Sequence, residues 1–327
     1  MSLTQNTLAA IFAEGARTRS SWNDRLTHWE RPASDSEEIQ IERAASMVRS
    51  ALAGNAWLRS EGVVVSAQGS YFNNTNVRLE SDMDLRAVHP LVRIVYGNDV
   101  IVEYAQKAHG IPQVGRYFSD VIVEMRRQIT TSLMEKFGAA SVDASGNKAI
   151  RLKKLPGSRS DLDIVPMFKY LWVWWNNPAR QYGQNPGVTI LGGNGTWIHN
   201  FPDQHAANGI TKRAQTGNRF KRHVRIFKRL RDELVREGKL APGSVPSFLI
   251  ECLTYAVEDG YFLVETDDRY ERAKRILARM WELLDNPLWT STATEINGIK
   301  FLFNIAQPWT VNDAKGFVAL ALAQLRI

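Results

Sequence analysis

The chain has 327 residues, of which 44% are hydrophobic and 23% charged, and its formal net charge is +7. This length allows one large or two modest domains, and the hydrophobic content excludes global disorder. The single cysteine, Cys252, excludes a disulfide framework and a multi-cysteine zinc site. No apolar run approaches the length of a membrane span and the N-terminus is polar, so we expect a cytoplasmic protein with no membrane partner.

A long helix is expected over residues 36–58. Ser34 and Glu37 form a capping-box pattern at its start. Apolar residues then recur at helical spacing, which predicts a buried face. These residues are Ile41, Ala44, Val48 and Leu52.

Short strands are expected to alternate with helices up to about residue 170. Residues 97–140 are periodic enough for helices. An apolar strand near residue 165 is expected to stop at Pro166, because proline cannot donate to a strand ladder. The strands are expected in "EGVVVSAQGS" (61–70), "SDMDLRAV" (81–88), "NKAIRLKKL" (147–155) and "SDLDIVPMF" (160–168).

The character of the chain changes near residues 200–210. Residues 171–210 are rich in Gly, Asn and Trp and are expected to be irregular, with Trp174 and Trp175 as a core anchor. After them an all-α half is expected, because apolar residues recur at helical spacing. Its four helices are expected over 217–238, 246–260, 269–285 and 312–325.

A pair of carboxylates follows a Gly-Ser turn. Asp82 and Asp84 share one strand face, and Gly69-Ser70 ends the preceding strand. Asp-x-Asp alone fits a solvated strand end. The upstream glycine, however, lets a ligand approach the backbone, and a serine beside free N–H groups can hold phosphate oxygens. Together they indicate a metal-bridged triphosphate.

A third carboxylate would complete such a site. "SDLDIVPMF" offers Asp161 and Asp163, and either could reach the same sheet face as Asp82 and Asp84 if the two strands are neighbours. Three convergent carboxylates can hold two Mg²⁺ ions, one activating an attacking hydroxyl and the other neutralising the triphosphate. This chemistry is nucleotidyl transfer.

The pattern "GS…SDMDLRAV…DLDIVP" resembles the DNA polymerase β-like nucleotidyltransferase superfamily. With "GTWIHNFPDQH", "NRFKRHVRIFKRLRD", "PSFLIECL" and "QPWTVNDAKGF", the chain resembles the bacterial cGAS/DncV-like nucleotidyltransferases (CD-NTases). These enzymes make cyclic oligonucleotide signals in anti-phage (CBASS) defence. The resemblance implies an α+β fold with a core lobe of mixed sheet and a long N-terminal helix (1–205), a helical lobe (206–327), and an active site in the cleft between them.

The resemblance also implies roles for individual residues and partners. Gly69 and Ser70 match the phosphate-holding turn. Asp82, Asp84 and Asp163 match the metal ligands, because the third acid of the family precedes "IVP" as Asp163 does. Lys228 and Ser247 match contacts to the triphosphate, and Phe248 matches a ring that stacks on a base, where the family often has Tyr. Expected cofactors are two Mg²⁺ ions, with Mn²⁺ as a substitute; expected partners are NTP substrates, ATP and GTP among them, and a separate effector protein that binds the product.

Other interpretations stay open beside this one. Lys221, Arg225 and Lys228 recur at helical spacing, which by itself favours a solvated basic face. Phe248 could belong to a core. His199 and His205 suggest a metal but, without other clustered ligands, favour packing.

The activity also has alternatives. A template-independent linear polymerase would use the same carboxylates, and a non-catalytic nucleic-acid-binding module would use the basic helix at 218–236. The carboxylates argue against the module, and one cysteine cannot build the zinc site of DNA-sensing animal relatives, so we do not expect direct nucleic-acid binding.

Overall fold

The computed structural model describes residues 18–32, 34–69, 73–77, 83–111, 115–155, 158–193, 195–263 and 268–325. These residues form two compact units. The sheet unit contains the described residues between 34 and 73 and between 83 and 203. The helical unit contains those before 33, those from 74 to 77 and those from 204 onward. No helix within the described ranges is long and apolar enough to cross a membrane.

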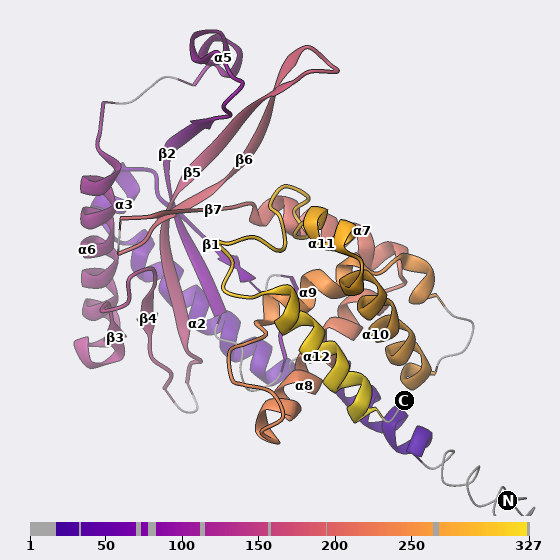
Figure 1. Cartoon of the computed structure of the whole chain (residues 1–327). Helices are drawn as coiled ribbons and strands as arrows, with labels where there is room; N and C mark the ends of the chain where they lie inside the picture. Colours follow the sequence, from indigo (N-terminus) through magenta and orange to yellow (C-terminus); the bar gives the residue numbers. More distant parts are fainter. Residues whose placement is uncertain are drawn as a thin grey trace, which may run out of the picture. The chain divides into compact units, whose positions relative to one another are not determined.

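A mixed sheet forms the centre of the sheet unit (Figure 1). β2 pairs with β1 in antiparallel fashion and with β5 in parallel fashion, and β4 and β6 run antiparallel to β5. Mixed pairing confirms the predicted α+β class. The strands are β1 (Val64–Gln68), β2 (Met83–Tyr96), β3 (Val142–Asp143), β4 (Ile150–Leu152), β5 (Leu162–Asn176), β6 (Gln181–Leu191) and β7 (Trp197–Asn200).

Helices α2 (Asp35–Ala53), α3 (Ala56–Ser60) and α6 (Phe118–Phe137) cover one face of this sheet (Figure 1). The apolar face predicted from the sequence is confirmed. Its members Ile41, Ala44, Val48 and Leu52 are at most 3% exposed. They pack with Leu85 and Ala87 of β2 and with Leu162, Ile164 and Phe168 of β5.

The predicted single helix over 36–58 is wrong at its end, because the chain breaks at Gly54 and restarts as α3. Asn55 caps α3, accepting at Oδ1 a hydrogen bond from Leu58 N at 2.9 Å. Such a cap satisfies backbone groups that a continuous helix would have bonded internally.

The predicted strand end at Pro166 is also wrong, because β5 continues to Asn176. On one edge of β5 the partner β4 pairs only as far as Ile164, and β6 begins to pair at Phe168. Pro166 lies between these two ladders, where its missing N–H interrupts neither of them.

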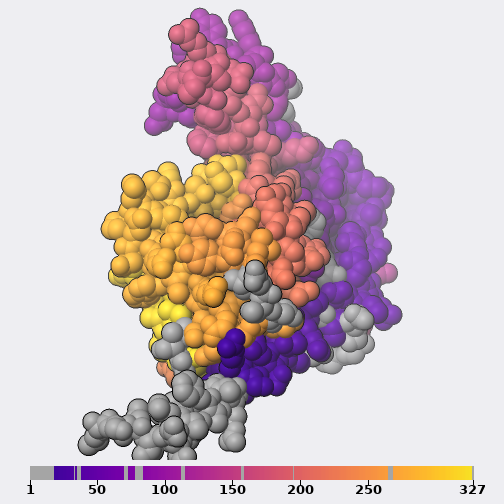
Figure 2. Space-filling model, turned by 90° about the vertical axis from the view of Figure 1, so that its right-hand side faces the viewer, coloured from indigo at the N-terminus to yellow at the C-terminus, as the bar shows by residue number. Residues whose placement is uncertain are grey.

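Residues 171–200, expected to be irregular, form a long β5–β6 hairpin and the short strand β7. Gly183 makes this pairing possible, since a Cβ there would overlap the indole ring of its register partner Trp174. The far ends of β2, β5 and β6 extend beyond the rest of the sheet unit together with α5 (Val102–His109), as Figures 1 and 2 show. Trp174 and Trp175 lie on this extension, half-buried and outside the core clusters, so their prediction as a core anchor is wrong.

The helical unit has one large core in which helices surround α8. Its four predicted helices are confirmed as α8, α9, α10 and α12, and helix α7 follows directly on β7. Residues 18–29 are helical, and the further helices of this unit are α7 (Pro202–Gln215), α8 (Arg219–Arg236), α9 (Ser247–Ala256), α10 (Arg269–Asp285), α11 (Pro287–Thr292) and α12 (Val311–Gln324). Short 3₁₀ turns cover Ala139–Ser141 and Asp259–Tyr261.

Residues 18–32 belong to the helical unit, although the sequence places all of 1–205 in the core lobe. Leu26 is fully buried in the helical core, and Asn23 Oδ1 accepts a hydrogen bond from Tyr270 N at 3.0 Å. Arg25 pairs with the buried Glu233 of α8. Trp22 and Trp29 pack against the same core, and only the fold shows which of the two cores this segment joins.

Candidate active site

Asp84 and Asp163 are register partners on the parallel strands β2 and β5. Their neighbours Leu85 and Ile164 face the helices α2 and α6. Since side chains alternate along a strand, both carboxylates lie on the opposite face of the sheet. The backbone therefore places two carboxylates side by side on one face, as the Asp-x-Asp pattern and "DIVP" predict for neighbouring strands.

Gly69 lies against Asp84. Its φ is +75°, a left-handed conformation, and a Cβ built on it would overlap Asp84 Oδ2 and lie 3.2 Å from Asp84 Cγ. Only glycine meets both conditions without strain. The turn after β1 is thus shaped to let the Asp84 carboxylate lie directly on the backbone.

Arg86 lies on the same sheet face as Asp84, two residues further along β2. Its guanidinium donates to Ser66 Oγ of β1 and to Asp203 Oδ1, both at 2.9 Å. These bonds fix a cation beside the carboxylates within the sheet unit. The sequence motif gave Arg86 no role; its position two residues after Asp84 was the available signal.

Asp161 has a different environment from Asp163. Its Oδ1 accepts hydrogen bonds from Arg151 Nε at 3.3 Å and from Lys154 N at 3.0 Å. Burial raises the pKa of Asp161, but the Arg151 and Lys154 contacts outweigh it and lower the pKa overall. The carboxylate of Asp161 therefore stabilises the turn between β4 and β5, and Asp163 as the third acid stays a prediction.

Ser70 and Asp82, two of the predicted site residues, lie outside the described residues. Within the described ranges no group of three or more metal-binding side chains occurs. The predicted set of three carboxylates is therefore represented by Asp84 and Asp163, and its completion by Asp82 stays a prediction.

Lys228 is buried in the helical unit with 1% of its surface exposed. Its Nζ donates to Thr75 O at 2.9 Å and lies 3.7 Å from Glu251 Oε2. Burial lowers the pKa of Lys228, and the charge of Glu251 opposes this shift. The amine thus joins α8 to the segment at residue 75, and its predicted contact with a triphosphate stays a prediction.

The wider basic stripe is not a solvated face, and this alternative is wrong. Lys221 and Arg225 are 5% and 6% exposed. They lie on the same face of α8 as Lys228 because residues seven apart share a helix face.

Ser247 and Phe248 open helix α9, whose first turn presents free N–H groups. Ser247 Oγ accepts a hydrogen bond from Arg231 Nη2 at 3.2 Å. Phe248 is 36% exposed, and its ring lies 5.4 Å from that of His205 and 6.0 Å from that of Trp309. A partly exposed ring backed by two others is a suitable stacking platform, so Phe248 is not a plain core residue.

Glu251 connects these predicted residues, and the sequence analysis did not identify it. It is 5% exposed, accepts from Thr75 Oγ1 at 2.9 Å, and lies 3.3 Å from His205 Nε2. Burial raises the pKa of Glu251, but Lys228, His205 and Thr75 outweigh it and lower the pKa to about 2. The available signal was a lone acid four residues after Ser247 on an otherwise apolar helix.

The contacts of His199, His205 and Cys252 are packing contacts within the fold. His199 stacks on Tyr170 with ring centroids 4.1 Å apart and contacts Thr189 Oγ1 at 2.9 Å. Burial raises the pKa of the Cys252 thiol well above its ordinary value, so the thiol is unreactive.

Comparison with known proteins decides between the families that could use this arrangement. Residues 207–325 match the cGAS/DncV-like nucleotidyltransferase C-terminal helical domain. A cyclic dipyrimidine nucleotide synthase CdnE of Legionella pneumophila is 32% identical over 312 residues, covering 93% of this chain and 98% of that protein. The chain belongs to the bacterial cGAS/DncV-like nucleotidyltransferases.

Other CD-NTases agree with this assignment. A cyclic dipurine nucleotide synthase of Elizabethkingia meningoseptica is 29% identical over 298 residues, covering 90% of this chain and 94% of that protein. The solved CdnE cyclic dinucleotide synthase of that organism, with GTP and Apcpp, superposes with a TM-score of 0.72 at 26% identity, covering 93% and 99% of the two chains. As a CD-NTase, the protein is a nucleotidyltransferase.

Proposed function

We propose that this CD-NTase joins nucleoside triphosphates and closes a ring, releasing a small cyclic oligonucleotide, most simply a cyclic dinucleotide. The observation that carries the proposal is that Asp84 of β2 and Asp163 of β5 are register partners, with the Gly69 backbone lying against Asp84. The names of the relatives support it, since one is a cyclic dipyrimidine and another a cyclic dipurine nucleotide synthase. Both names describe a ring of two nucleotides, but they differ in the type of base.

We propose a pair of Mg²⁺ ions as cofactors, with Mn²⁺ as a substitute. Two carboxylates on adjacent strands supply the hard oxygen ligands that these cations prefer. Asp84 and Asp163 would hold the metal, with Asp82 as the further ligand that the motif predicts. The ions, when bound, would lower the pKa of an attacking hydroxyl and offset charge on the triphosphate.

Each phosphodiester bond forms by the same substitution at phosphorus. A ribose hydroxyl of one nucleotide attacks the α-phosphorus of another, the new P–O bond forms, and the bond from the α-phosphorus to the bridging oxygen breaks. Pyrophosphate leaves, and the hydroxyl proton passes to a base or to solvent. Gly69 keeps the backbone clear of Asp84 while this happens, and Ser247 and Lys228 are proposed to bind the phosphates.

A ring needs two such bonds. The first gives a linear intermediate that keeps its triphosphate, and this intermediate must turn over for the second. Stacking on Phe248 tolerates different bases and so permits the turn. We propose purine nucleotides, ATP and GTP among them, as substrates, because a larger flat base gains more from stacking. Their binding in a cleft between the two units stays a prediction.

The cellular setting is part of the proposal. We place the enzyme in the cytoplasm, in anti-phage defence, where its cyclic product would be bound by a separate effector protein. Because one cysteine cannot build the zinc site of DNA-sensing animal relatives, we propose that the enzyme is regulated by something other than direct sensing of duplex DNA.

Release of pyrophosphate tests the nucleotidyl transfer itself. The full chain is incubated with the four NTPs and Mg²⁺, and pyrophosphate is measured for wild type, Asp163→Asn and Asp161→Asn. We expect release by wild type and Asp161→Asn only. Release by all three would contradict the assignment of Asp163, and release by none while the proteins remain folded would contradict the nucleotidyl transfer.

A further inference from the structure

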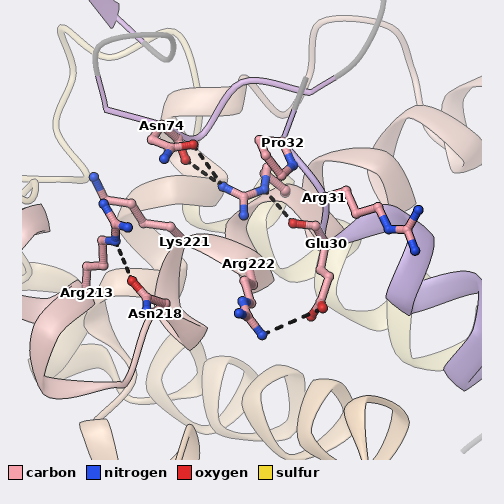
Figure 3. Close-up of a pocket in the computed structure, with 9 residues that line it drawn as sticks. Glu30, Arg31, Pro32, Asn74, Arg213, Asn218, Lys221 and Arg222 are labelled. Atoms are coloured by element: carbon pink, nitrogen blue, oxygen red, sulfur yellow. Dashed lines mark hydrogen bonds and ion pairs between the residues drawn. The ribbon is translucent and has the colours of Figure 1, made fainter. Parts of the chain in front are cut away.

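A basic pocket lies within the helical unit (Figure 3). Its volume is about 330 Å³, at the small end of the range of about 300–1,000 Å³ for small-molecule sites. It is bordered by five cationic side chains and a single carboxylate. Its lining residues are Glu30, Arg31, Pro32, Asn74, Arg213, Asn218, Lys221, Arg222 and Arg225.

Two of these cationic side chains are buried. Lys221 and Arg225 are only 5% and 6% exposed. Arg225 donates from Nε to Glu30 O and from Nη1 to Asn74 O, both at 2.7 Å. Burying charged groups is costly, and a fold that retains two of them beside a hollow holds them ready for an anion.

Two further arginines of the pocket are also oriented. Arg213 donates from Nε to Asn218 Oδ1 at 2.6 Å, and Arg222 Nη1 lies 3.7 Å from Glu30 Oε1 (Figure 3). A guanidinium already fixed by one bond loses less conformational freedom when its other N–H groups bind a ligand.

The one carboxylate does not balance this charge. Glu30 Oε1 is shared between Arg222 and Arg269, whose Nη2 lies 2.9 Å away. The pKa of Arg225 is lowered to about 10, mainly by burial; the charge of Glu30 opposes this shift, and the nearby Arg222, Arg229 and Arg213 contribute to it. Mutual repulsion of this kind is relieved by a multiply charged anion.

We propose that this pocket binds a small oligophosphate, such as pyrophosphate or inorganic triphosphate, through Arg213, Lys221, Arg222 and Arg225. Several cations around a small hollow match several linked phosphates better than one carboxylate or one phosphate, and arginine forks match phosphate oxygens in pairs. Lys228 does not line this pocket; it lies three residues beyond Arg225 and seven beyond Lys221 on α8, about 10 Å from Lys221 at the helical rise. The site does not rest on the proposed activity.

Calorimetric titration of the full chain with inorganic triphosphate, in EDTA and at constant ionic strength, tests the site. EDTA separates it from a metal-dependent active site. We expect wild type and Asp163→Asn to bind equally well, and Arg213→Gln and Arg222→Gln each to lose about tenfold in affinity, or about 1.4 kcal/mol. Arg236→Gln, an exposed arginine of the same helix outside the pocket, is the matched control and should bind as wild type does.

Three results would overturn the proposal. Unchanged binding by both pocket variants, or no binding by wild type, would show that the pocket is not the site. Equal loss in Arg236→Gln would show general attraction to a basic surface. Tighter binding of a single-stranded RNA oligonucleotide, lost in the same pocket variants, would replace the small ligand by a nucleic acid. Both arginines are partly or largely exposed, so their variants should keep the wild-type melting temperature.

Discussion

The backbone of Gly69 lies so close to the Asp84 carboxylate that a Cβ would overlap Oδ2. The turn after β1 and the strand β2 are thereby fitted to each other within the sheet unit. The sequence shows both residues, but only their packing shows that the identity of one sets the position of the other.

Gly69→Ala should therefore displace the carboxylate. We expect activity to fall by about 10²-fold, since a shift of about 1 Å in a reacting group has that effect. Gly238→Ala is the matched control: its φ is +70°, with nothing within 4 Å of an added Cβ. Both variants carry the backbone strain of about 1–2 kcal/mol, so an equal loss of activity in both would remove the link to Asp84.

Asp84→Asn and Asp163→Asn should each lower pyrophosphate release by at least about 10²-fold without unfolding the protein, because each removes a carboxylate that is proposed to hold the metal. Asp161→Asn should keep activity close to wild type and cost at most about 1 kcal/mol, as expected for a half-exposed ion pair with Arg151. Rates and melting curves are measured together. The reverse order of activities would show that Asp161 is the third acid.

Lys228→Met should destabilise the helical unit by about 3–5 kcal/mol, because Glu251 would keep a buried charge without its nearest cation. Adding Glu251→Gln should recover part of this loss, which urea unfolding of both single variants and the double variant can measure. If Lys228 also binds triphosphate, the folded double variant should still show an apparent KM for NTP raised about tenfold, equivalent to one charge-assisted contact. A wild-type KM in that variant would leave Lys228 with a structural role alone.

Phe248→Ala should weaken NTP binding by about 1–3 kcal/mol, the contribution of one stacked base, while Phe248→Tyr should bind as wild type does. Phe301→Ala, which removes another half-exposed ring of the helical unit, is the control. KM values for each NTP provide the comparison. If Phe248→Ala loses only melting temperature, the ring serves to pack against His205 and Trp309.

Acid should destabilise the protein through His223. This residue is 1% exposed, and its burial lowers the pKa to about 3 while its bond to Arg219 O opposes the shift. The unfolded chain takes up a proton near pH 6.5 and the folded chain does not until about pH 3, so stability is present above pH 6.5 and is lost as the pH falls. At pH 5 the loss should be about 2 kcal/mol. His223→Leu should show a smaller loss between pH 7 and pH 5 in chemical unfolding, and an unchanged loss would place the acid sensitivity elsewhere.

The sequence predicted those parts of the fold that depend on local pattern. The face of α2 and the helices after residue 216 follow from apolar spacing, and the neighbouring positions of Asp84 and Asp163 follow from strands that carry a known motif. The β5–β6 hairpin did not follow, because its pairing depends on Gly183 accepting the ring of Trp174 across the strands. Pro166 was misleading because its tolerance depends on where β4 and β6 stop.

Part of the candidate site depends on long-range packing and could not be predicted from the sequence. Glu251 connects Thr75, Lys228 and His205 across more than a hundred residues of chain, and no local pattern distinguishes it from a solvated acid. The same holds for the basic pocket: two of its cations, Lys221 and Arg225, were interpreted as part of a solvated stripe, and only the fold places Glu30 and Asn74 beside them.

The identity of the product tests the central claim most directly. The full chain is incubated with the four NTPs and Mg²⁺, treated with phosphatase, and its products are identified by mass spectrometry. We predict a cyclic dinucleotide of purines that resists phosphatase, formed with two pyrophosphates per molecule and absent with Asp163→Asn. A ladder of linear products that lengthens with time and loses its terminal phosphates to phosphatase would show a linear polymerase and would contradict the account.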